Sequence, residues 1–371
     1  MKIGLVLDDG LDAPDGVQQY VLAIGAELSR RGFDVHYLAG QTARRDLPNL
    51  HSLSKNIQVK FNQNKMRMPL PARRSALKNL LAKEKFDVLH IQMPYSPFLA
   101  GRIIKLAPRG TRIVGTWHIA PASRIVSFGG RILRILNRRT LKKFNQTVAV
   151  SSVAADFAEK IFKTRPSDVI PNPVDLKRFQ IAAREFQTKP GQILFLGRLV
   201  ERKNPELLLD AAEFALKNNL WPPNARIVIA GDGSLRSRLE QRARNLHLPV
   251  KFLGFISESD KPRILAESQV AVFPSSGGES FGIVLTEAMA AGALVLGGDN
   301  PGYRSTLSGR DESLFDPHNP AELARKISST LKNPKFVQLA LAWQNSRLQN
   351  FDVKNVVDRL LKIYAPNSAM L

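Results

Sequence analysis

The chain has 371 residues, which is more than one hydrophobic core ordinarily holds and predicts two domains. It contains no cysteine, which excludes disulfides, thiolate metal sites and a cysteine nucleophile. With 54 Lys and Arg against 32 acidic residues, its formal net charge of +22 favours an anionic partner, either a membrane surface, a nucleic acid or a phosphorylated ligand.

The N-terminal segment and the apolar runs indicate where the protein acts. Asp8 and Asp9 interrupt the first apolar run before a signal-peptide core could form. No apolar run approaches the roughly 18 residues that a membrane-spanning helix needs. We therefore expect a cytoplasmic protein, which can still lie on the inner face of a membrane.

The first 150 residues alternate short apolar segments with longer stretches. The apolar segments are residues 2–7, 33–38, 86–91, 112–117 and 147–150. Between the first two, residues 17–30 have the spacing of an amphipathic helix, which ends at Gly32. Short buried strands separated by helices are typical of a parallel sheet covered on both faces, so we predict a Rossmann-like domain over residues 1–171.

A second series of the same kind begins after a Pro-rich segment. We predict a linker over residues 172–190 and a second Rossmann-like domain over residues 191–352. The expected strands and helices are 192–196, 205–217, 226–230, 235–246, 250–253, 261–267, 270–273, 281–291 and 293–296, in chain order. Two such domains would form a deep cleft at the carboxyl ends of their strands, where α/β sheets bind ligands.

The positive charge is concentrated between Lys60 and Asn145, where 19 Lys and Arg against two acids supply +17 of the total. Residues 73–83 and 131–143 both place apolar side chains on one helical face and cations on the other. Such helices bind anionic lipids, at about 1 kcal/mol per Lys or Arg, although the same pattern fits a helix whose apolar face is core. We predict membrane contacts from Arg73, Arg74, Lys78 and Lys83. Nucleic acid is not expected, because no recognition module or stacking platform occurs, and no obligate protein partner is evident.

The loop 197–205 follows the first strand of the second domain. It places Arg198 and Lys203 at the carboxyl end of the sheet. Two cations there can clamp a diphosphate and stabilise it as a leaving group. Solvated loop cations are the alternative interpretation.

The segment 277–292 is more specific. It places Glu279 in a Gly-rich loop and Glu287 eight positions later, inside the following helix. The free amides at the start of that helix form a ready anion site. A glutamate that merely happens to face the cleft is the alternative, and the nearby Arg198 and Lys203 argue against it.

These two loops, with Gly231-Asp232-Gly233, resemble the retaining family 4 glycosyltransferases of GT-B fold, and the resemblance covers nearly the whole chain. Residues 12–19, 115–118, 170–172 and 277–292 look especially like the phosphatidylinositol mannosyltransferases. The resemblance implies two Rossmann-like domains facing across a deep cleft, with residues 353–371 returning to the first domain. It also implies transfer of mannose from GDP-mannose to a lipid such as phosphatidylinositol.

The resemblance assigns roles residue by residue. The implied donor-binding residues are Gly16, Arg198, Lys203, Ile256, Lys261, Phe281, Gly282, Ile283 and Glu287. Among them, the two loop cations would hold the diphosphate, Glu287 the ribose, and the loop 254–258 the base. The implied catalytic residues are His118, beside the transferred sugar, and Glu279, at its hydroxyls, while Gln18 would contact the acceptor head group.

One departure concerns the loop before the first helix, where Asp15 stands in place of the first of two glycines. An acid beside a diphosphate is unfavourable unless it points away, so this position affects donor geometry or acceptor choice. We expect the leaving phosphate to take the acceptor proton, because no carboxylate pair has glycosidase-like placement.

Other functions stay open at this point. A UDP-sugar donor or a soluble acceptor is the first alternative, and a degenerate lipid- or nucleic-acid-binding protein is the second. A GT-B epimerase or phosphorylase is a more distant one. We expect no tightly bound cofactor and no metal site, since no Asp-x-Asp sequence and no zinc-like His spacing occurs, although a divalent cation could stimulate.

Overall fold

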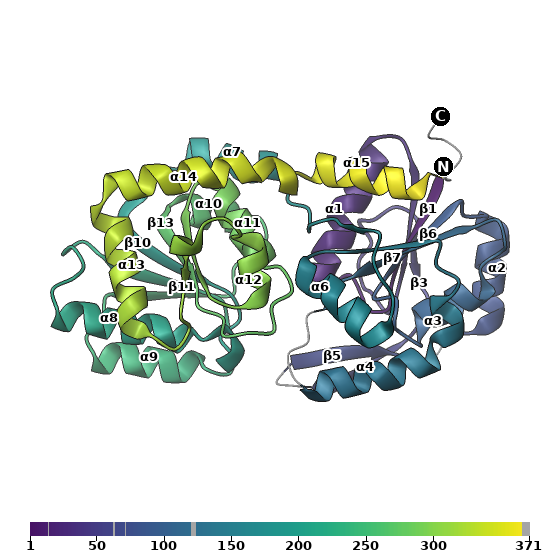
Figure 1. Ribbon diagram of the computed structural model, residues 1–371, viewed down its shortest axis with the longest axis horizontal. Coiled ribbons are helices and arrows are strands. Elements are labelled where there is room, and N and C mark those ends of the chain that lie inside the picture. Colours follow the sequence, from purple (N-terminus) through teal and green to yellow (C-terminus); the bar gives the residue numbers. More distant parts are fainter. Residues whose placement is uncertain (14, 62–63, 71, 120–123, 366–371) are drawn as a thin grey trace. The chain divides into compact units, whose positions relative to one another are not determined.

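The computed structural model describes residues 1–13, 15–61, 64–70, 72–119 and 124–365, without the side chains of 57–61, 64–69 and 124–128. The chain forms two compact units (Figure 1). Unit 1 comprises Met1–Pro173 and Val353–Leu371, and unit 2 comprises Val174–Asp352.

Unit 1 contains a seven-stranded parallel sheet with the order β3-β2-β1-β6-β7-β8-β9. Its strands are β1 (Lys2–Leu7), β2 (Asp34–Ala39), β3 (Leu50–Ser52), β6 (Val88–Gln92), β7 (Arg112–Trp117), β8 (Gln146–Ala149) and β9 (Asp168–Val169). An antiparallel hairpin of β4 (Asn56–Phe61) and β5 (Asn64–Pro69) is separate from this sheet.

Helices cover both faces of this sheet. They are α1 (Gly16–Arg30), α2 (Arg74–Glu84), α3 (Leu99–Leu106), α4 (Arg124–Leu136), α5 (Arg138–Leu141), α6 (Ser152–Phe157), the π-helical turn Ala158–Phe162 and α15 (Val353–Tyr364). Leu89 and Ile91 of β6 pack with α2 and α3, whereas His90 contacts Tyr20 of α1 and Tyr364 of α15. The alternation of β6 therefore separates an apolar face from a polar one.

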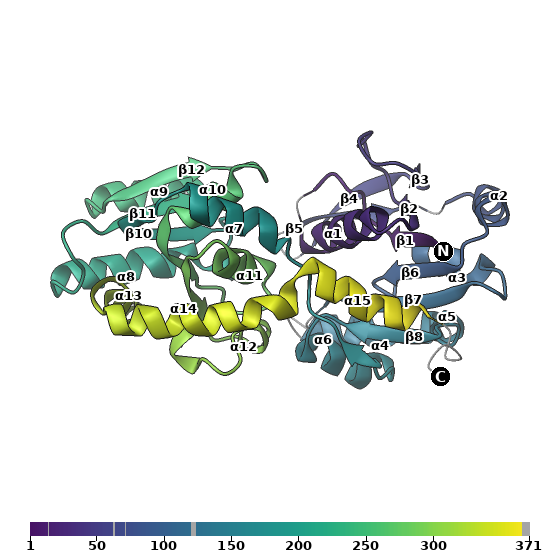
Figure 2. The same ribbon diagram turned by 90° about the horizontal axis from the view of Figure 1, so that it is seen from above.

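Helix α15 lies against α1 in unit 1 (Figures 1 and 2). The side chain of Arg31 pairs with Asp358 and donates to the Lys354 carbonyl oxygen at 2.9 Å. Arg359 Nη2 lies 2.7 Å from Asp168 Oδ1, beside β9. Tyr364 is 2% exposed, so both charge pairs and core packing hold this last helix.

Unit 2 contains a six-stranded parallel sheet with the order β12-β11-β10-β13-β14-β15. Its strands are β10 (Lys189–Leu196), β11 (Arg226–Ala230), β12 (Val250–Gly254), β13 (Ser268–Phe273), β14 (Leu294–Gly298) and β15 (Leu314–Phe315). Its helices are α7 (Leu176–Glu185), α8 (Pro205–Lys217), α9 (Arg236–Asn245), α10 (Lys261–Ala266), α11 (Ile283–Ala290), α12 (Pro301–Thr306), α13 (Pro320–Lys332) and α14 (Pro334–Leu348), with 3₁₀ turns at Glu201–Lys203, Asp311–Ser313 and Gln349–Phe351.

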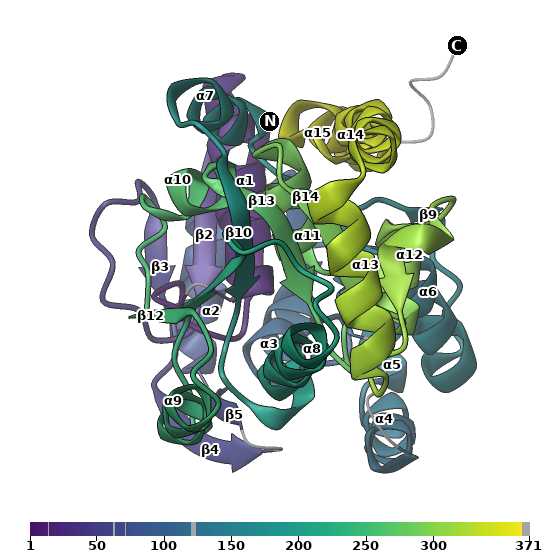
Figure 3. The same ribbon diagram turned by 90° about the vertical axis from the view of Figure 1, so that its left-hand side faces the viewer.

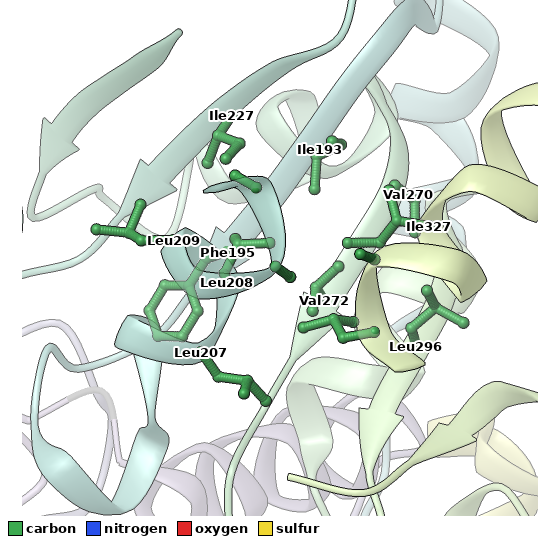
Figure 4. Close-up of a cluster of buried hydrophobic side chains, with 14 of the residues drawn as sticks. Ile193, Phe195, Leu207, Leu208, Leu209, Ile227, Val270, Val272, Leu296 and Ile327 are labelled. Carbon is green, nitrogen blue, oxygen red and sulfur yellow. The ribbon is translucent and has the colours of Figure 1, made fainter. Parts of the chain in front are cut away.

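The core of unit 2 follows from alternation along its strands. Ile193 and Phe195 of β10 point to the same face and pack with Leu208 of α8 and Ile327 of α13 (Figure 4). These two helices lie side by side over that face (Figures 1 and 3). Each such side chain stabilises the fold by about 1.5–3 kcal/mol relative to exposure. The core thereby fixes the strand ends from which the functional loops leave.

The polar stretch that we expected to be a linker instead contains α7 and the start of β10. Leu176 and Phe179 are buried, and Asp175 caps α7 by accepting a hydrogen bond from the Arg178 amide at 3.3 Å. Half of the side chains of α7 are polar or charged and only three of its residues are buried, so its sequence resembles that of a linker.

Candidate active site

Two loops meet at the carboxyl end of the unit 2 sheet. One follows β10 and contains Arg202 and Lys203, and the other follows β13 and contains Glu279. Glu279 Oε1 lies 2.9 Å from Lys203 Nζ, and Arg202 Nη1 pairs with the same oxygen. Burial opposes ionisation of this carboxyl, but the charges of Lys203 and Arg202 outweigh burial and lower the pKa of Glu279 to about 2. Glu279 is therefore a carboxylate at neutral pH.

Further hydrogen bonds, from side chains and from the backbone, hold the two loops together. Ser275 Oγ lies 3.0 Å from both Glu279 Oε1 and the carbonyl oxygen of Arg202. The Ser276 amide donates to that carbonyl at 3.2 Å, and Arg202 Nη1 donates to the Gly277 carbonyl at 3.3 Å. Sequence reasoning missed Arg202, although its place directly before Lys203 in the same short turn was a usable signal.

The start of α11 depends on glycine. Gly282 has φ +92°, and a Cβ there would lie 2.6 Å from Tyr303 Cε1. Phe281 is buried, and its carbonyl oxygen accepts a hydrogen bond from Thr306 Oγ1 at 2.6 Å. Ile283 is the first residue of α11, so the predicted backbone site of residues 281–283 lies at a helix N-terminus, where amides attract oxygen atoms.

Glu287 forms a second, separate carboxylate site inside α11. Its Oε1 lies 2.8 Å from Lys261 Nζ, and both side chains are less than a tenth exposed. Glu258 Oε2 also lies 2.8 Å from the same nitrogen. Burial raises the pKa of Glu287, because desolvation outweighs the attraction of Lys261. The structure thus joins the predicted ribose residue to the predicted base-binding loop.

The other predicted donor residues of unit 2 lie in neighbouring loops. Arg198 is exposed after β10, and Ile256 is half-buried after β12. The Leu199 amide donates to the Asp232 carbonyl oxygen at 2.9 Å, which places the glycine turn 231–233 against the β10 loop. All three loops leave the same end of the sheet, because the strands are parallel.

The predicted catalytic, donor and acceptor residues of unit 1 lie directly after β7 and in the first turn of α1. His118 directly follows β7, is buried, and its Nε2 lies 2.7 Å from Gln92 Oε1. Burial, with the nearby His90 as a smaller cause, lowers the pKa of His118 to about 3, so its ring is neutral. Gln18 is buried and donates to Asp9 Oδ2 at 3.2 Å.

Gly16 and Asp15 stand at the N-terminus of α1. Gly16 is the first residue of the helix and is exposed. Asp15 has an extended backbone, and its side chain makes no capping hydrogen bond with α1. The position thus gives up the stabilisation of about 1 kcal/mol that a capping carboxylate can supply.

The basic surface of unit 1 differs between its two predicted helices. Arg73, Arg74, Lys78 and Lys83 are all exposed at or in α2. However, Leu77 and Leu81 of α2 are buried in the core with α3, so α2 presents cations without an apolar face.

Helix α4 has the opposite property. Ile132, Ile135 and Leu136 are 46%, 69% and 63% exposed, and Arg131 and Arg139 beside them are exposed as well. The far side of α4 packs through Gly130, where a Cβ would lie 2.7 Å from Ile161 Cγ2. The exposed apolar face of the predicted basic segments is therefore on α4.

Two properties of the described residues bear on ligands and membranes. Across residues 1–365, apart from the gaps given above, His, Asp and Glu side chains nowhere gather in threes in a way that could hold a metal ion. Within the same ranges, no helix has both the length and the apolar character needed to cross a membrane.

Comparison with known proteins identifies the family. Residues 14–178 match the family "Glycosyltransferase Family 4", and residues 177–345 match "Glycosyl transferases group 1". The phosphatidyl-myo-inositol mannosyltransferase of Mycobacterium tuberculosis is 30% identical over 376 residues, which cover 98% of this chain and 96% of that protein. The enzyme of the same name from Propionibacterium freudenreichii is 30% identical over 359 residues, covering 91% and 88%.

Solved structures agree on the fold. A glycosyltransferase from Rickettsia africae superposes with a TM-score of 0.76 at 17% identity, covering 98% of this chain and 97% of that one. Anabaena HepE in complex with UDP and glucose gives 0.72 at 18% identity, covering 98% and 99%. With two Rossmann-like units and relatives along its whole length, the chain belongs to the family 4 glycosyltransferases of GT-B fold.

Proposed function

We propose that the protein transfers mannose from GDP-mannose to phosphatidylinositol with retention of configuration, at the inner face of a membrane. The observation that carries the proposal is the Glu279 carboxylate held by Lys203 and Arg202 at the strand ends of unit 2. The names of the relatives that are 30% identical supply the sugar and the acceptor. The UDP complexes among the similar structures concern proteins under 20% identical, so they indicate the fold and not the donor.

The donor would be held mainly by charge. Arg198 and Lys203 would bind the diphosphate, and Arg202 would share this task, because guanidinium groups are strong phosphate ligands. When the diphosphate pairs with Arg202 and Lys203 in place of Glu279, the Glu279 oxygens would become free to accept hydrogen bonds from sugar hydroxyls. Glu287 would bind the ribose, and the loop 254–258, with Lys261 nearby, would contact the base.

The acceptor would be held by unit 1. Gln18 would contact the head group, Gly16 would let the α1 loop approach the phosphates, and His118 would lie beside the sugar. Catalysis would come from orientation and from neutralising the departing diphosphate, whose oxygen takes the acceptor proton. No covalent glycosyl-enzyme intermediate is required.

Membrane contact would combine charge and apolar insertion. The cations of α2 attract anionic lipids at a distance, at about 1 kcal/mol each. Ile132, Ile135 and Leu136 of α4 would enter the interface, where each buried apolar Å² contributes about 25 cal/mol. We predict that the triple replacement I132S/I135S/L136S releases the protein from vesicles that contain phosphatidylinositol.

A matched control separates insertion from general surface polarity. Leu216 on α8 is 52% exposed and belongs to unit 2, so L216S removes a similarly exposed side chain that is not part of the basic surface of unit 1. Vesicle flotation should distinguish the two variants at equal melting temperature. Equal retention of the triple variant and the parent would contradict the assignment of α4.

The activity itself is tested with GDP-mannose and phosphatidylinositol vesicles, by isolating mannosylated lipid. Parallel arms replace the donor by UDP-glucose and the vesicles by water-soluble inositol phosphate. Mannolipid that forms only with GDP-mannose and vesicles supports the proposal. Transfer from UDP-glucose would show that the proposed donor is wrong, and transfer to inositol phosphate alone would show that the proposed acceptor is wrong. Inertness in all arms would favour a lipid-binding protein with a degenerate site.

A further inference from the structure

A buried polar layer lies under α1 and α15 in unit 1. Gln92 ends β6 and is directly opposite Thr116 of β7 in the parallel register. Since side chains alternate along strands, His90, Gln92, Thr116 and His118 all point to this same face. Gln92 is fully buried, which is unusual for an amide side chain.

With the amide oxygen of Gln92 facing the ring, the contact between Gln92 and His118 has one consistent proton arrangement. Gln92 Oε1 lies 2.7 Å from His118 Nε2. A carbonyl oxygen only accepts, so Nε2 carries the hydrogen and donates it. The ring is neutral, because burial lowers the pKa of His118 to about 3. Nδ1 is therefore left with a lone pair, and His118 offers an acceptor there.

We propose that Gln92 is a positioning residue, which holds His118 in the Nε2–H tautomer so that Nδ1 accepts a hydrogen bond from a hydroxyl group of the transferred sugar. This inference rests on the proposed function of His118. The opposite tautomer would direct the Nε2 lone pair at Gln92 Oε1 over 2.7 Å, which is repulsive. The ring of Tyr20 packs edge-on against His118 at 4.8 Å and limits its rotation.

The amide of Gln92 is poorly explained by stability alone. Among the described residues, its Nε2 has no hydrogen-bond partner although it is buried. Leaving a buried donor unpaired destabilises the fold, and an apolar side chain of the same size avoids that penalty. An amide at this position is accounted for by what its oxygen does to His118.

The neighbouring His90 provides an internal contrast. Its Nε2 lies 2.6 Å from Thr116 Oγ1 and its Nδ1 lies 2.6 Å from the hydroxyl of Tyr364. Both ring nitrogens are thus occupied within unit 1, so His90 offers no atom to a ligand. Tyr364→Phe removes a hydroxyl from the same buried layer without touching His118, which makes it the matched control.

The test combines two Gln92 variants with a readout of the histidine tautomer. Gln92→Met removes the acceptor at similar volume, and Gln92→Glu keeps an acceptor as the conservative rescue. Long-range ¹⁵N NMR of labelled histidine reports the tautomer of His118 without any substrate, with the signal assigned through a His118 variant. Mannosyl transfer is then measured as kcat and as KM for the donor.

We expect Gln92→Met to lose the pure Nε2–H tautomer and to lower kcat by about 10- to 100-fold, by analogy with residues that orient metal-ligating histidines. Gln92→Glu should keep the tautomer, restore most of kcat and add a limb to the pH profile, because a carboxylate raises the pKa of His118. Tyr364→Phe should leave the His118 signals and kcat unchanged.

The outcomes separate this inference from the proposed function. A parent protein that transfers mannose while Gln92→Met keeps both tautomer and kcat would overturn the inference alone. An equal loss in Tyr364→Phe would also overturn it, because the effect would then be general to the polar layer. If the parent protein does not transfer mannose although Gln92→Met changes the tautomer of His118, the proposed function is overturned, and with it the role of His118 toward the sugar. If Gln92→Met does not fold, a Gln92→Glu protein with the parent's pH profile would still refute the idea.

Discussion

The buried pair of Lys261 and Glu287 makes a quantitative prediction about unit 2. The two side chains are 8% and 7% exposed, and their charged atoms lie 2.8 Å apart. Lys261→Met would remove the cation and keep most of the side-chain volume. Glu287 would then be a carboxyl group buried without its partner on α10, a situation that strongly destabilises proteins.

Protonation limits the cost. A carboxyl with an ordinary pKa of 4.5 that must be neutral at pH 7 costs at most about 3.4 kcal/mol, at about 1.36 kcal/mol per pH unit. Because the pKa of Glu287 is already raised beside Lys261, we expect a loss smaller than this limit. For a unit of this size, each kcal/mol of lost stability lowers the melting temperature by about 2–4 °C.

The pH dependence gives the prediction its sign. A carboxyl whose pKa is raised on folding costs nothing below its ordinary pKa, and it costs more as the pH rises above that value. The deficit of Lys261→Met should therefore shrink to below about 1 kcal/mol at pH 5. Thermal unfolding of parent and variant between pH 5 and 8 measures this trend directly.

Two further variants control the experiment. Lys217→Met removes the cation of an exposed pair with Glu213, whose atoms lie 2.7 Å apart, and should leave the melting temperature nearly unchanged, because solvent screens such a pair. The double variant Lys261→Met with Glu287→Met should recover at least half of the lost stability, because it removes the buried charge. A pH-independent deficit, or no recovery in the double variant, would refute the electrostatic explanation.

Three other predictions concern the site. Glu279→Gln should lower transfer about 100-fold or more, because a neutral amide neither holds Lys203 nor binds sugar hydroxyls as a charged acceptor. As the control, Glu185→Gln replaces an exposed glutamate of α7 and should have no effect in the same assay. Gly302→Ala would place a Cβ 2.1 Å from the carbonyl oxygen of Glu279. This substitution should therefore cost about 1–3 kcal/mol of stability and most of the activity. Gly277→Ala serves as its control, because a Cβ there meets no atom within 4 Å. The pKa values of Glu279 and His118 are about 2 and about 3, so neither residue should give kcat/KM a limb between about pH 5 and 8. A limb in that range that disappears in Glu279→Gln or His118→Ala would contradict the assignment.

The central strands of both parallel sheets and the strand-end loops could be predicted from the sequence, because apolar runs and glycine turns report local structure directly. The short strands β3, β9 and β15 and the β4-β5 hairpin were not predicted. Residues 2–7, 112–117 and 226–230 form strands with the predicted bounds, and residues 205–217 form a helix with the predicted bounds. The loop of Glu279 follows β13 as its spacing predicted. These features depend on neighbours in the chain, which the sequence displays.

Contacts between distant segments could not be predicted in this way. Leu77 of α2 is 1% exposed and Ile135 of α4 is 69% exposed, although both lie in basic segments with the same apolar spacing. The packing partner decides which face is core, and Leu77 and Leu81 of α2 pack in one cluster with residues of α3. Arg202 was missed although it directly precedes Lys203, because only the structure shows that it pairs with Glu279, 77 residues further along the chain.

The charge states of Glu279 and His118 support a positioning role in the proposed reaction. Opposite physical causes give the same result, since cations keep Glu279 ionised and burial keeps His118 neutral. A general base works best with a pKa near the working pH, and neither residue meets that condition. The proton of the acceptor hydroxyl then needs another destination. The departing diphosphate gains negative charge as its bond to the sugar breaks, so we propose that the substrate supplies the base and the protein supplies position and charge.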